Sequence, residues 1–425
     1  MFFLRVFTGN ISFRIAALSS GISVGLLIIS VIVLGACAGT LPAVRDAGAI
    51  DLPQKLISLS DIEYQGAFAL PAETFGQSSA NWAEGVIEVS GEALYVVGHD
   101  QDDAVGEFLI PELRLGSDIQ DLIYADVPRQ AFTTVLDKAS RGNPEDLDQI
   151  MGLELYQQRL FGNALQYYDA PADNLLTSFV VADSGNLSGS QIDGFFSLNG
   201  RARAAGWLSQ VPGVWQQRLG CTHISGHSSG GPIISRHSVG PSAFCVNLAD
   251  MLSDNPKRSV RTAEMLGFRL GFQLHNDLFN ESGENKLWTH LSQARFGFIV
   301  PGTATYLTIG TSGGHGSGVG YKLERGGEVC GGYCSVDPAD NYNYYWLWDM
   351  NDLVAVRDGK LPANWPKPYE SGVFRIPFKS GSAMASIGGG SYDSVTGRLY
   401  LSLLNVNDSL GRESNPPIIA AYRIK

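Results

Sequence analysis

Short runs of apolar and aromatic residues, each ended by glycine or a polar turn, recur along most of the chain. Runs of this length that are rich in β-branched and aromatic residues predict β-strands. A first run, at 62–71, marks the start of the folded part. The others lie at 91–100, 158–169, 175–185, 295–302, 304–314, 371–378, 396–407 and 417–424.

Helical patterns are few and short. They occur at 127–140, 259–268 and 350–356. This is too little helix to cover both faces of a parallel sheet, which excludes a doubly wound α/β fold. The pattern therefore predicts an all-β protein with short helical insertions.

Four of the strand runs begin at a turn and place an aromatic residue beside aliphatic ones. They lie at 93–98, 159–168, 305–310 and 398–403, at uneven distances along the chain. This style resembles the inner strands of β-propellers, as in uncharacterised secreted bacterial proteins. The resemblance implies one propeller over residues 61–425 with about five to seven four-stranded blades. The ring would close by pairing 417–424 with 62–71, and a pair of β-sandwiches is the alternative.

Composition and charge narrow the class of protein. The chain has 44% hydrophobic residues, 17% charged residues and 50 glycines, which suits a turn-rich fold with a large core. The formal net charge is −12, and it becomes −14 once residues 1–36, with the two cations Arg5 and Arg14, are removed. An acidic protein of this kind repels phosphate backbones, so nucleic acid is excluded as a partner.

The N-terminus reads as an export signal. Two arginines precede an almost wholly apolar run at 15–36. The sequence Leu34-Gly35-Ala36-Cys37 resembles the lipobox of bacterial lipoproteins, which implies a signal peptide over 1–36, lipidation of Cys37 and a tether over 37–60. An uncleaved membrane anchor is the alternative. Both place the rest of the chain outside the cytoplasm, tethered to a membrane of the bacterial cell envelope.

The remaining cysteines predict disulfides. Cys221, Cys245, Cys330 and Cys334 make an even number in an exported chain, and three pairings are possible. Nearness in sequence favours Cys221 with Cys245 and Cys330 with Cys334. The first bond would close a loop of about 25 residues and stabilise the fold by roughly 3 kcal/mol.

The stretch 206–246 combines three histidines with a glycine- and serine-rich backbone. His223 and His227 are four residues apart, a spacing that puts them on one face, and with His237 they could bind Zn²⁺. The same side chains could instead act as acid and base. This second interpretation resembles propeller enzymes that cleave anionic polysaccharides by elimination. The candidate catalytic residues are His99, His223, His227, Tyr168 and Arg236.

Two other stretches offer ligand-binding side chains. His99 is followed by Asp100, Asp102 and Asp103, which could line a pocket or bind Ca²⁺. The stretch 337–352 is the most aromatic of the chain: Tyr344 offers a flat face to a sugar, whereas Trp346 and Trp348 are expected in the core. His315 lies in the glycine-rich segment 311–320, beside the expected funnel.

Two functions remain open on this basis. The first is a cell-envelope propeller that binds a glycan or an envelope protein at the mouth of the funnel. The second is a polysaccharide lyase or hydrolase that uses histidine and tyrosine. Both place His99, His223, His227 and His315 on one face, and neither fixes a cofactor.

Overall fold

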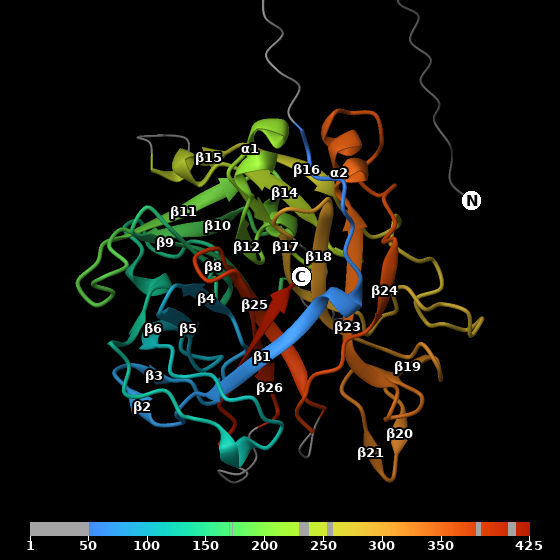
Figure 1. The fold of residues 1–425 in the computed structure, drawn as a ribbon, viewed down its shortest axis with the longest axis horizontal. Helices are drawn as coiled ribbons and strands as arrows, with labels where there is room; N and C mark the ends of the chain where they lie inside the picture. The colour runs from blue at the N-terminus through green and yellow to red at the C-terminus, as the bar shows by residue number, and fades with distance from the viewer. Residues whose placement is uncertain are drawn as a thin grey trace, which may run out of the picture. The chain divides into compact units, whose positions relative to one another are not determined.

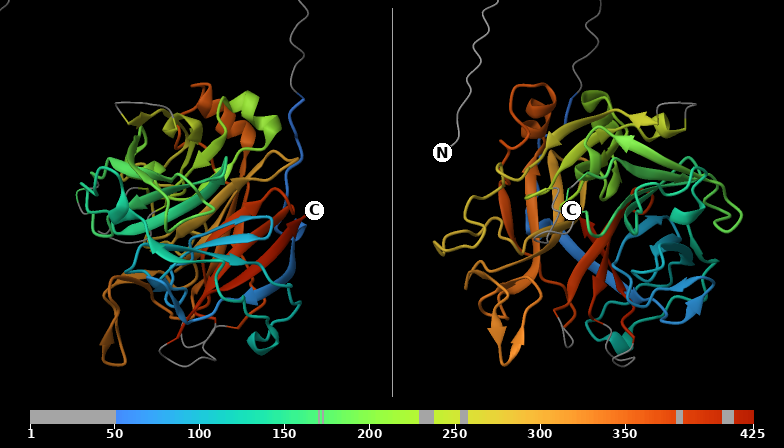
Figure 2. Two further views of the ribbon diagram at one scale, coloured as in Figure 1. Left: turned by 90° about the vertical axis from the view of Figure 1, so that its left-hand side faces the viewer. Right: turned by 180° about the vertical axis from the view of Figure 1, so that it is seen from behind.

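The protein folds as a five-bladed β-propeller (Figure 1). The computed structural model describes residues 51–425 except 170, 172, 229–237, 253–257, 380–383 and 407–413. Five antiparallel sheets surround a central axis, and each innermost strand contacts the innermost strands of the two neighbouring blades. Figure 2 shows the same ring from the side and from behind.

Blades one to three follow the chain from the inside outwards. Blade one contains β4 (Ile87–Ser90), β5 (Ala93–Val97), β6 (Ala104–Leu109) and β7 (Gln130–Thr134). Blade two contains β8 (Gln149–Tyr156), β9 (Arg159–Leu165), β10 (Leu176–Val181) and β11 (Ile192–Leu198), with β15 (Ser259–Val260) added parallel to its edge. Blade three contains β12 (Leu208–Gln210), β13 (His223–Ser225), β14 (Ala243–Val246) and β16 (Thr262–Leu266).

Blades four and five complete the ring. Blade four contains β17 (Gln293–Ile299), β18 (Thr305–Gly313), β23 (Asn341–Asp349) and β24 (Glu370–Val373). Blade five contains β25 (Ser386–Asp393), β26 (Arg398–Leu404), β27 (Ile418–Ile424) and β1 (Ile62–Ala69). β1 therefore pairs with β27, from Ile62 opposite Ile424 to Ala69 opposite Ile418, which confirms the closure predicted from the sequence.

Smaller elements decorate the blades. In the described part of the chain the α-helices are α1 (Gly213–Leu219) and α2 (Met350–Arg357). Three two-stranded ribbons pair β2 (Thr74–Phe75) with β3 (Ser78–Ser79), β19 (Val319–Tyr321) with β22 (Tyr333–Ser335), and β20 (Glu324–Arg325) with β21 (Glu328–Val329). No helix among the described residues is long and apolar enough to cross a membrane.

Two of the three predicted helices are wrong. The window 127–140 contains β7 and a three-residue 3-10 helix (Leu136–Lys138), and the window 259–268 contains β15 and β16; of the three, only 350–356 is α-helical, as α2. Both of the misread windows lie at blade edges, where pairing with a neighbouring strand satisfies the backbone groups that a helix would satisfy internally. Tertiary pairing overrides a weak helical pattern in such short segments.

The aromatic-rich runs are not the innermost strands of the blades. They form β5, β9, β18 and β26, the second strand of four blades, where both faces of the sheet are buried. The innermost strands instead use glycine where two blades meet. A Cβ on Gly152 would overlap the carbonyl oxygen of Gly206, and one on Gly388 would overlap that of Glu84. Close approach at the axis thus requires residues without side chains.

Both predicted disulfides are present. Cys221 bonds to Cys245, with Cα atoms 5.6 Å apart, and Cys330 bonds to Cys334, with Cα atoms 6.6 Å apart. The segment 51–60, assigned to the tether from the sequence, contacts blade four: Ile57 is buried and the Ala304 amide donates to Lys55 O.

Candidate functional site

The five innermost strands run in the same direction, so all of them begin on one side of the ring. Gly85 meets Gly388 and the Val89 amide donates to Ser391 Oγ, which shows that β4 and β25 advance together. We call the side on which these strands begin the mouth face and the other side the opposite face. Loops that join the second strand of a blade to the third also lie on the mouth face.

Three blades converge on one carboxylate at the mouth face. Glu84, just before β4 in blade one, accepts a hydrogen bond from Gln149 Nε2, at the start of β8 in blade two. Arg295 Nη1, from β17 in blade four, lies 4.0 Å from Glu84 Oε2. The Glu84 and Arg295 side chains are 35% and 27% exposed, so a ligand can reach both. These three side chains form the floor of the mouth.

Exposed aromatic side chains flank this floor. Trp82, two residues before Glu84, is 43% exposed, and Tyr167 and Tyr168, in the loop after β9, are 51% and 58% exposed. The Tyr167 amide donates to Asp148 Oδ1 at 2.5 Å, next to Gln149, which places that loop beside the floor. Flat apolar faces next to charged and amide groups are what a sugar ring requires.

The turn after β5 adds acids to the rim. His99 bridges to Ala83, and the Asp100 amide donates to Trp82 O, so the turn lies next to the floor. His99 Nδ1 is 2.8 Å from Asp100 Oδ1. Burial, then the like charges of Asp148, Asp137 and Asp102, raises the pKa of Asp103 to about 7. A carboxyl group that keeps its proton near neutral pH can donate it to a ligand.

A small cavity lies at the axis beneath the mouth. Val86, Met151, Trp207 and Gly390 line a cavity of about 10 Å³ there, together with Arg295. This is room for about one water molecule. This cavity is therefore too small to hold a sugar ring.

Two further carboxyl groups lie deeper, near the end of the inner strands. Glu88 in β4 accepts hydrogen bonds from Ser391 Oγ at 2.8 Å and from the Leu155 amide at 3.0 Å. Burial, then the nearby Glu154, raises the pKa of Glu88 well above its usual value. Burial raises the pKa of Glu154 in β8 to about 8. Both groups thus hold protons in conditions where exposed glutamates are ionised.

His223 belongs to this axial cluster. Its Nε2 is 3.6 Å from Glu154 Oε1, too far for a hydrogen bond, and has no hydrogen-bond partner among the described residues. Burial lowers the pKa of His223 to about 3. A neutral imidazole therefore faces a protonated carboxyl group, so the pair is not ionic near neutral pH. The His223 ring also contacts Tyr156 edge to face, with centroids 4.9 Å apart.

The predicted histidines do not form one group. His223 pairs with Gln210, where β12 ends, whereas His227 lies past the other end of β13, and its amide donates to Ser242 Oγ. The spacing of four residues therefore separates the two side chains along the blade. His99, His227 and His315 lie on mouth-face segments, whereas His223 lies toward the opposite face.

Two predicted ligand-binding residues are structural. His315 is buried between Asn285 O, 2.7 Å from Nδ1, and Ser312 Oγ, 2.8 Å from Nε2. Tyr344 is buried in blade four and donates to Lys286 O at 2.6 Å. Trp346 and Trp348 lie in the core as expected. Asp100 and Tyr168 are exposed at the mouth face, whereas Cys37, Arg236 and His237 lie outside the described residues.

Metal binding finds no support in the described part of the chain. No group of three or more histidine, cysteine, aspartate or glutamate side chains that could hold a metal ion occurs there. His223 and His227 diverge, which separates two of the three ligands expected for Zn²⁺. The Asp100 turn remains an acidic rim without the ligand set that Ca²⁺ requires.

Sequence reasoning missed the residues at the centre of the mouth and of the axis: Glu84, Gln149, Arg295, Glu88 and Glu154. A signal for the last two was available. Each acid interrupts an apolar strand, at VIEVS and at GLELY. A charged residue on a buried strand face requires a polar partner or a bound proton. Glu84 and Arg295 carry no such signal, because they meet only when the ring closes.

The chain was compared with known proteins. No known protein family matches the sequence, and no curated protein matches it. Several solved structures are similar in fold. One is the catalytic domain of a Coprinopsis cinerea GH62 α-L-arabinofuranosidase, which is 10% identical with a TM-score of 0.36. The match covers 85% of this chain and 97% of that one. A member of the GH130 family of mannoside phosphorylases, described as containing hydrolases that target β-1,2-mannosidic linkages in Candida mannan, matches at 10% identity and TM-score 0.37, covering 85% and 93%.

The WD40 repeats of RRP9 match at 10% identity and TM-score 0.29, covering 80% of this chain and 79% of that one. These similarities concern the propeller architecture alone. The matched structures include enzymes that act on glycans and a repeat domain of another kind. The function must therefore be inferred from the site.

Proposed function

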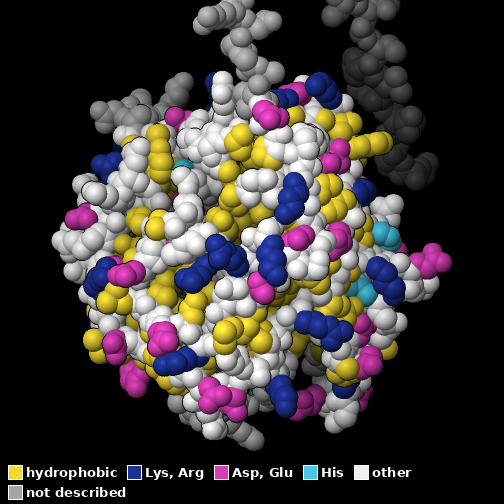
Figure 3. All heavy atoms as spheres, in the orientation of Figure 1, with side chains coloured by type: hydrophobic (Ala, Val, Ile, Leu, Met, Phe, Trp, Pro, Cys, Tyr) yellow, Lys and Arg dark blue, Asp and Glu magenta, His cyan; other side chains and the backbone are white. Residues whose placement is uncertain are grey.

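We propose that the protein is an extracytoplasmic propeller, tethered to the membrane of the bacterial cell envelope, that binds a carbohydrate at its mouth face. The observation that carries this proposal is the floor of Glu84, Gln149 and Arg295 beside exposed aromatic rings. Carboxylate, amide and guanidinium groups pair with hydroxyls, while Trp82 and Tyr168 offer stacking faces. The formal net charge of −12 favours a polar ligand over nucleic acid. On the face shown in Figure 3, acidic and basic side chains are interspersed without a cationic stripe.

Binding to immobilised glycans tests the proposal. Purified full-length protein is applied to an array of neutral and acidic oligosaccharides, and Trp82→Ala is compared with Trp365→Ala. Trp365 is 61% exposed and lies between α2 and β24, away from the inner strands, so it is a matched control. We expect Trp82→Ala to weaken binding about tenfold and Trp365→Ala to leave it unchanged. Binding of an envelope protein in place of any glycan would contradict the proposal.

The lipid tether is tested separately. Lipidation at Cys37 predicts incorporation of labelled palmitate into the wild-type chain in bacteria and loss of the label in Cys37→Ala. The propeller of the variant should still fold, because Cys37 lies outside the disulfide-bonded cysteines. Persistent membrane association without label would instead support an uncleaved anchor.

A second candidate function is glycoside hydrolysis at the same mouth. The raised pKa of Asp103 favours it, since a protonated carboxyl group can act as general acid. Release of reducing sugar from the bound glycan, lost in Asp103→Asn while binding persists, would establish it. Binding without turnover in the wild type would leave the protein a carbohydrate-binding propeller.

A further inference from the structure

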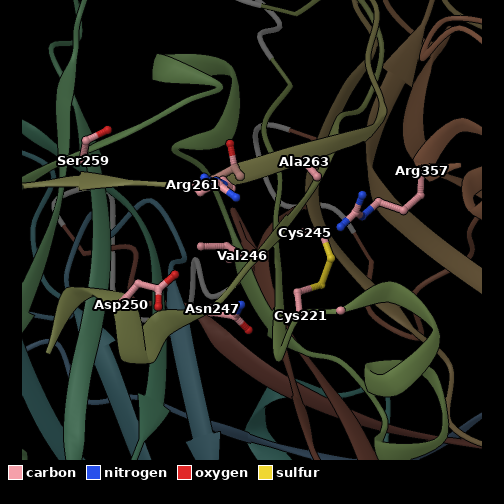
Figure 4. Close-up of a pocket in the computed structure, with 11 residues that line it drawn as sticks. Cys221, Cys245, Val246, Asn247, Asp250, Ser259, Arg261, Ala263 and Arg357 are labelled. Atoms are coloured by element: carbon pink, nitrogen blue, oxygen red, sulfur yellow. A yellow bond between two sulfur atoms is a disulfide. The ribbon is translucent and has the colours of Figure 1, made fainter. Parts of the chain in front are cut away.

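A pocket of about 540 Å³ opens among the ends of the blade-three strands (Figure 4). It is formed where β13 begins, where β14 ends, where β16 begins and where α2 ends. β13 and β16 run antiparallel to β12 and β14, so these ends lie toward the opposite face. The volume falls in the range of pockets that hold small molecules. The pocket is thus separate from the mouth.

Two arginines from different elements line this pocket. Arg261 lies between β15 and β16, just before β16 begins, and Arg357 is the last residue of α2. Arg357 Nε donates to Leu219 O at 3.2 Å, which holds the side chain while its terminal nitrogens remain for other acceptors. Neither guanidinium forms an ion pair with a carboxylate within the described segments. The carboxylate nearest to Arg357 in sequence, Asp358, pairs with Arg218 and Lys360.

The other walls fit the organic part of a ligand. The Cys221–Cys245 disulfide and Val246 form an apolar wall. In Figure 4 the Arg357 side chain extends from α2 toward the disulfide. Arg261, Asp250 and Asn247 lie on the opposite side of the disulfide from Arg357. Asn247 Oδ1 accepts from the Thr222 amide at 3.0 Å, so its amide nitrogen is the group left to donate to a ligand.

We propose that this pocket binds a small organic anion, whose carboxylate or sulfate group is held by Arg261 and Arg357 and whose carbon skeleton lies against the disulfide. Guanidinium forks match the geometry of such oxyanions. Two arginines that line one pocket, without an ion pair to any described carboxylate, are a specific feature in a chain of net charge −12. The proposal does not depend on carbohydrate binding at the mouth.

Calorimetric titration of the full-length protein with three probes tests this proposal. The probes are inorganic sulfate, D-galacturonate as a sugar carboxylate, and D-galactose as the neutral control. We expect sulfate and galacturonate to bind, galacturonate more tightly, and galactose not to bind. Arg261→Gln and Arg357→Gln should each weaken galacturonate binding about tenfold or more. Arg357→Lys, which keeps the charge without the fork, should give an intermediate loss.

Two controls accompany these substitutions. Arg114→Gln removes an exposed arginine paired with Glu112 and should change nothing. Unfolding transitions of each variant show whether loss of the Arg357 contact to Leu219 disturbs the fold. Galacturonate binding that survives both glutamine substitutions, or failure of sulfate and galacturonate to bind below about 10 mM, overturns the proposal. Sulfate binding without galacturonate binding overturns the part of the proposal that places a carbon skeleton against the disulfide.

Discussion

Glu84 and Glu88 are four residues apart at the same blade interface, yet they occupy opposite environments. Glu84 is about a third exposed and meets Gln149 and a cation, Arg295. Glu88 is 6% exposed and meets Ser391, the Leu155 amide and a second acid, Glu154. The first carboxylate can exchange its partners for a ligand. The second is fixed by hydrogen bonds that no ligand can replace.

Depth along the axis accounts for this difference. The glycines bring the blades close together between the two acids, and Glu84 is partly exposed while Glu88 and Glu154 are buried. A dry carboxyl group without a cation retains its proton. We therefore assign ligand binding to the mouth and a structural role to the axial pair, and three predictions test this division.

The largest expected effect is on stability. Glu88→Ala leaves the Leu155 amide and the Ser391 hydroxyl without their acceptor and opens a cavity, so we expect a loss of about 3 kcal/mol in the free energy of unfolding. Glu84→Ala removes a partly exposed side chain and should change it by less than about 1 kcal/mol. Urea unfolding of both variants measures the two values. Equal losses would remove the distinction between the two environments.

The next effect is on the pH dependence of stability. Burial raises the pKa of Glu154 to about 8 from its ordinary 4.5, so the native state holds a proton that the unfolded chain has released. Stability from this group is present below pH 4.5 and is lost as the pH rises through 8. His223 has the opposite sign, because its pKa falls to about 3 from 6.5, so its contribution grows from pH 3 to 6.5.

The contributions of Glu154 and His223 oppose each other between pH 4.5 and 6.5, and above pH 6.5 the loss due to Glu154 is no longer offset by His223. From pH 6.5 to 8 the loss due to Glu154 is about 2 kcal/mol. Glu154→Gln should reduce this fall in the free energy of unfolding, because the group that releases the proton is gone. The substitution also removes the acid that helps to raise the pKa of Glu88. Unfolding free energies measured at pH 5.5, 6.5 and 8 check the result. A decline as steep in the variant as in the wild type would show that Glu154 is already ionised.

The smallest effect on stability is expected at the mouth. Arg295→Gln removes the cation near Glu84, and such partly exposed pairs contribute between about 0 and 1 kcal/mol. We expect a shift in that range which disappears in 1 M salt. A loss of several kcal/mol would mean that Arg295 supports the ring and is not available to a ligand.

The sequence was sufficient for the fold and insufficient for the site. Short strands bounded by turns predicted an all-β fold, and the strand runs at 62–71 and 417–424 predicted that the ring closes. Both features can be read from the local pattern and from the order of the strands along the chain. The sequence did not single out the innermost strand of each blade, since the glycines there serve contacts between blades, as at Gly152 and Gly388. Histidine spacing suggested a shared site, but His223 is the first residue of β13 and His227 lies two residues past the other end of that strand. Contacts such as Glu84 with Arg295 join residues more than 200 positions apart, and no local pattern records them.

Affinity for the glycan selected by the array, measured by calorimetry for Glu84→Gln and Glu88→Gln, tests the central claim most directly. Both substitutions replace a carboxyl group by an amide and preserve side-chain shape. The division of roles predicts that Glu84→Gln weakens binding about tenfold while Glu88→Gln leaves it unchanged. Equal affinities for wild type and Glu84→Gln, or a loss confined to Glu88→Gln, would contradict it.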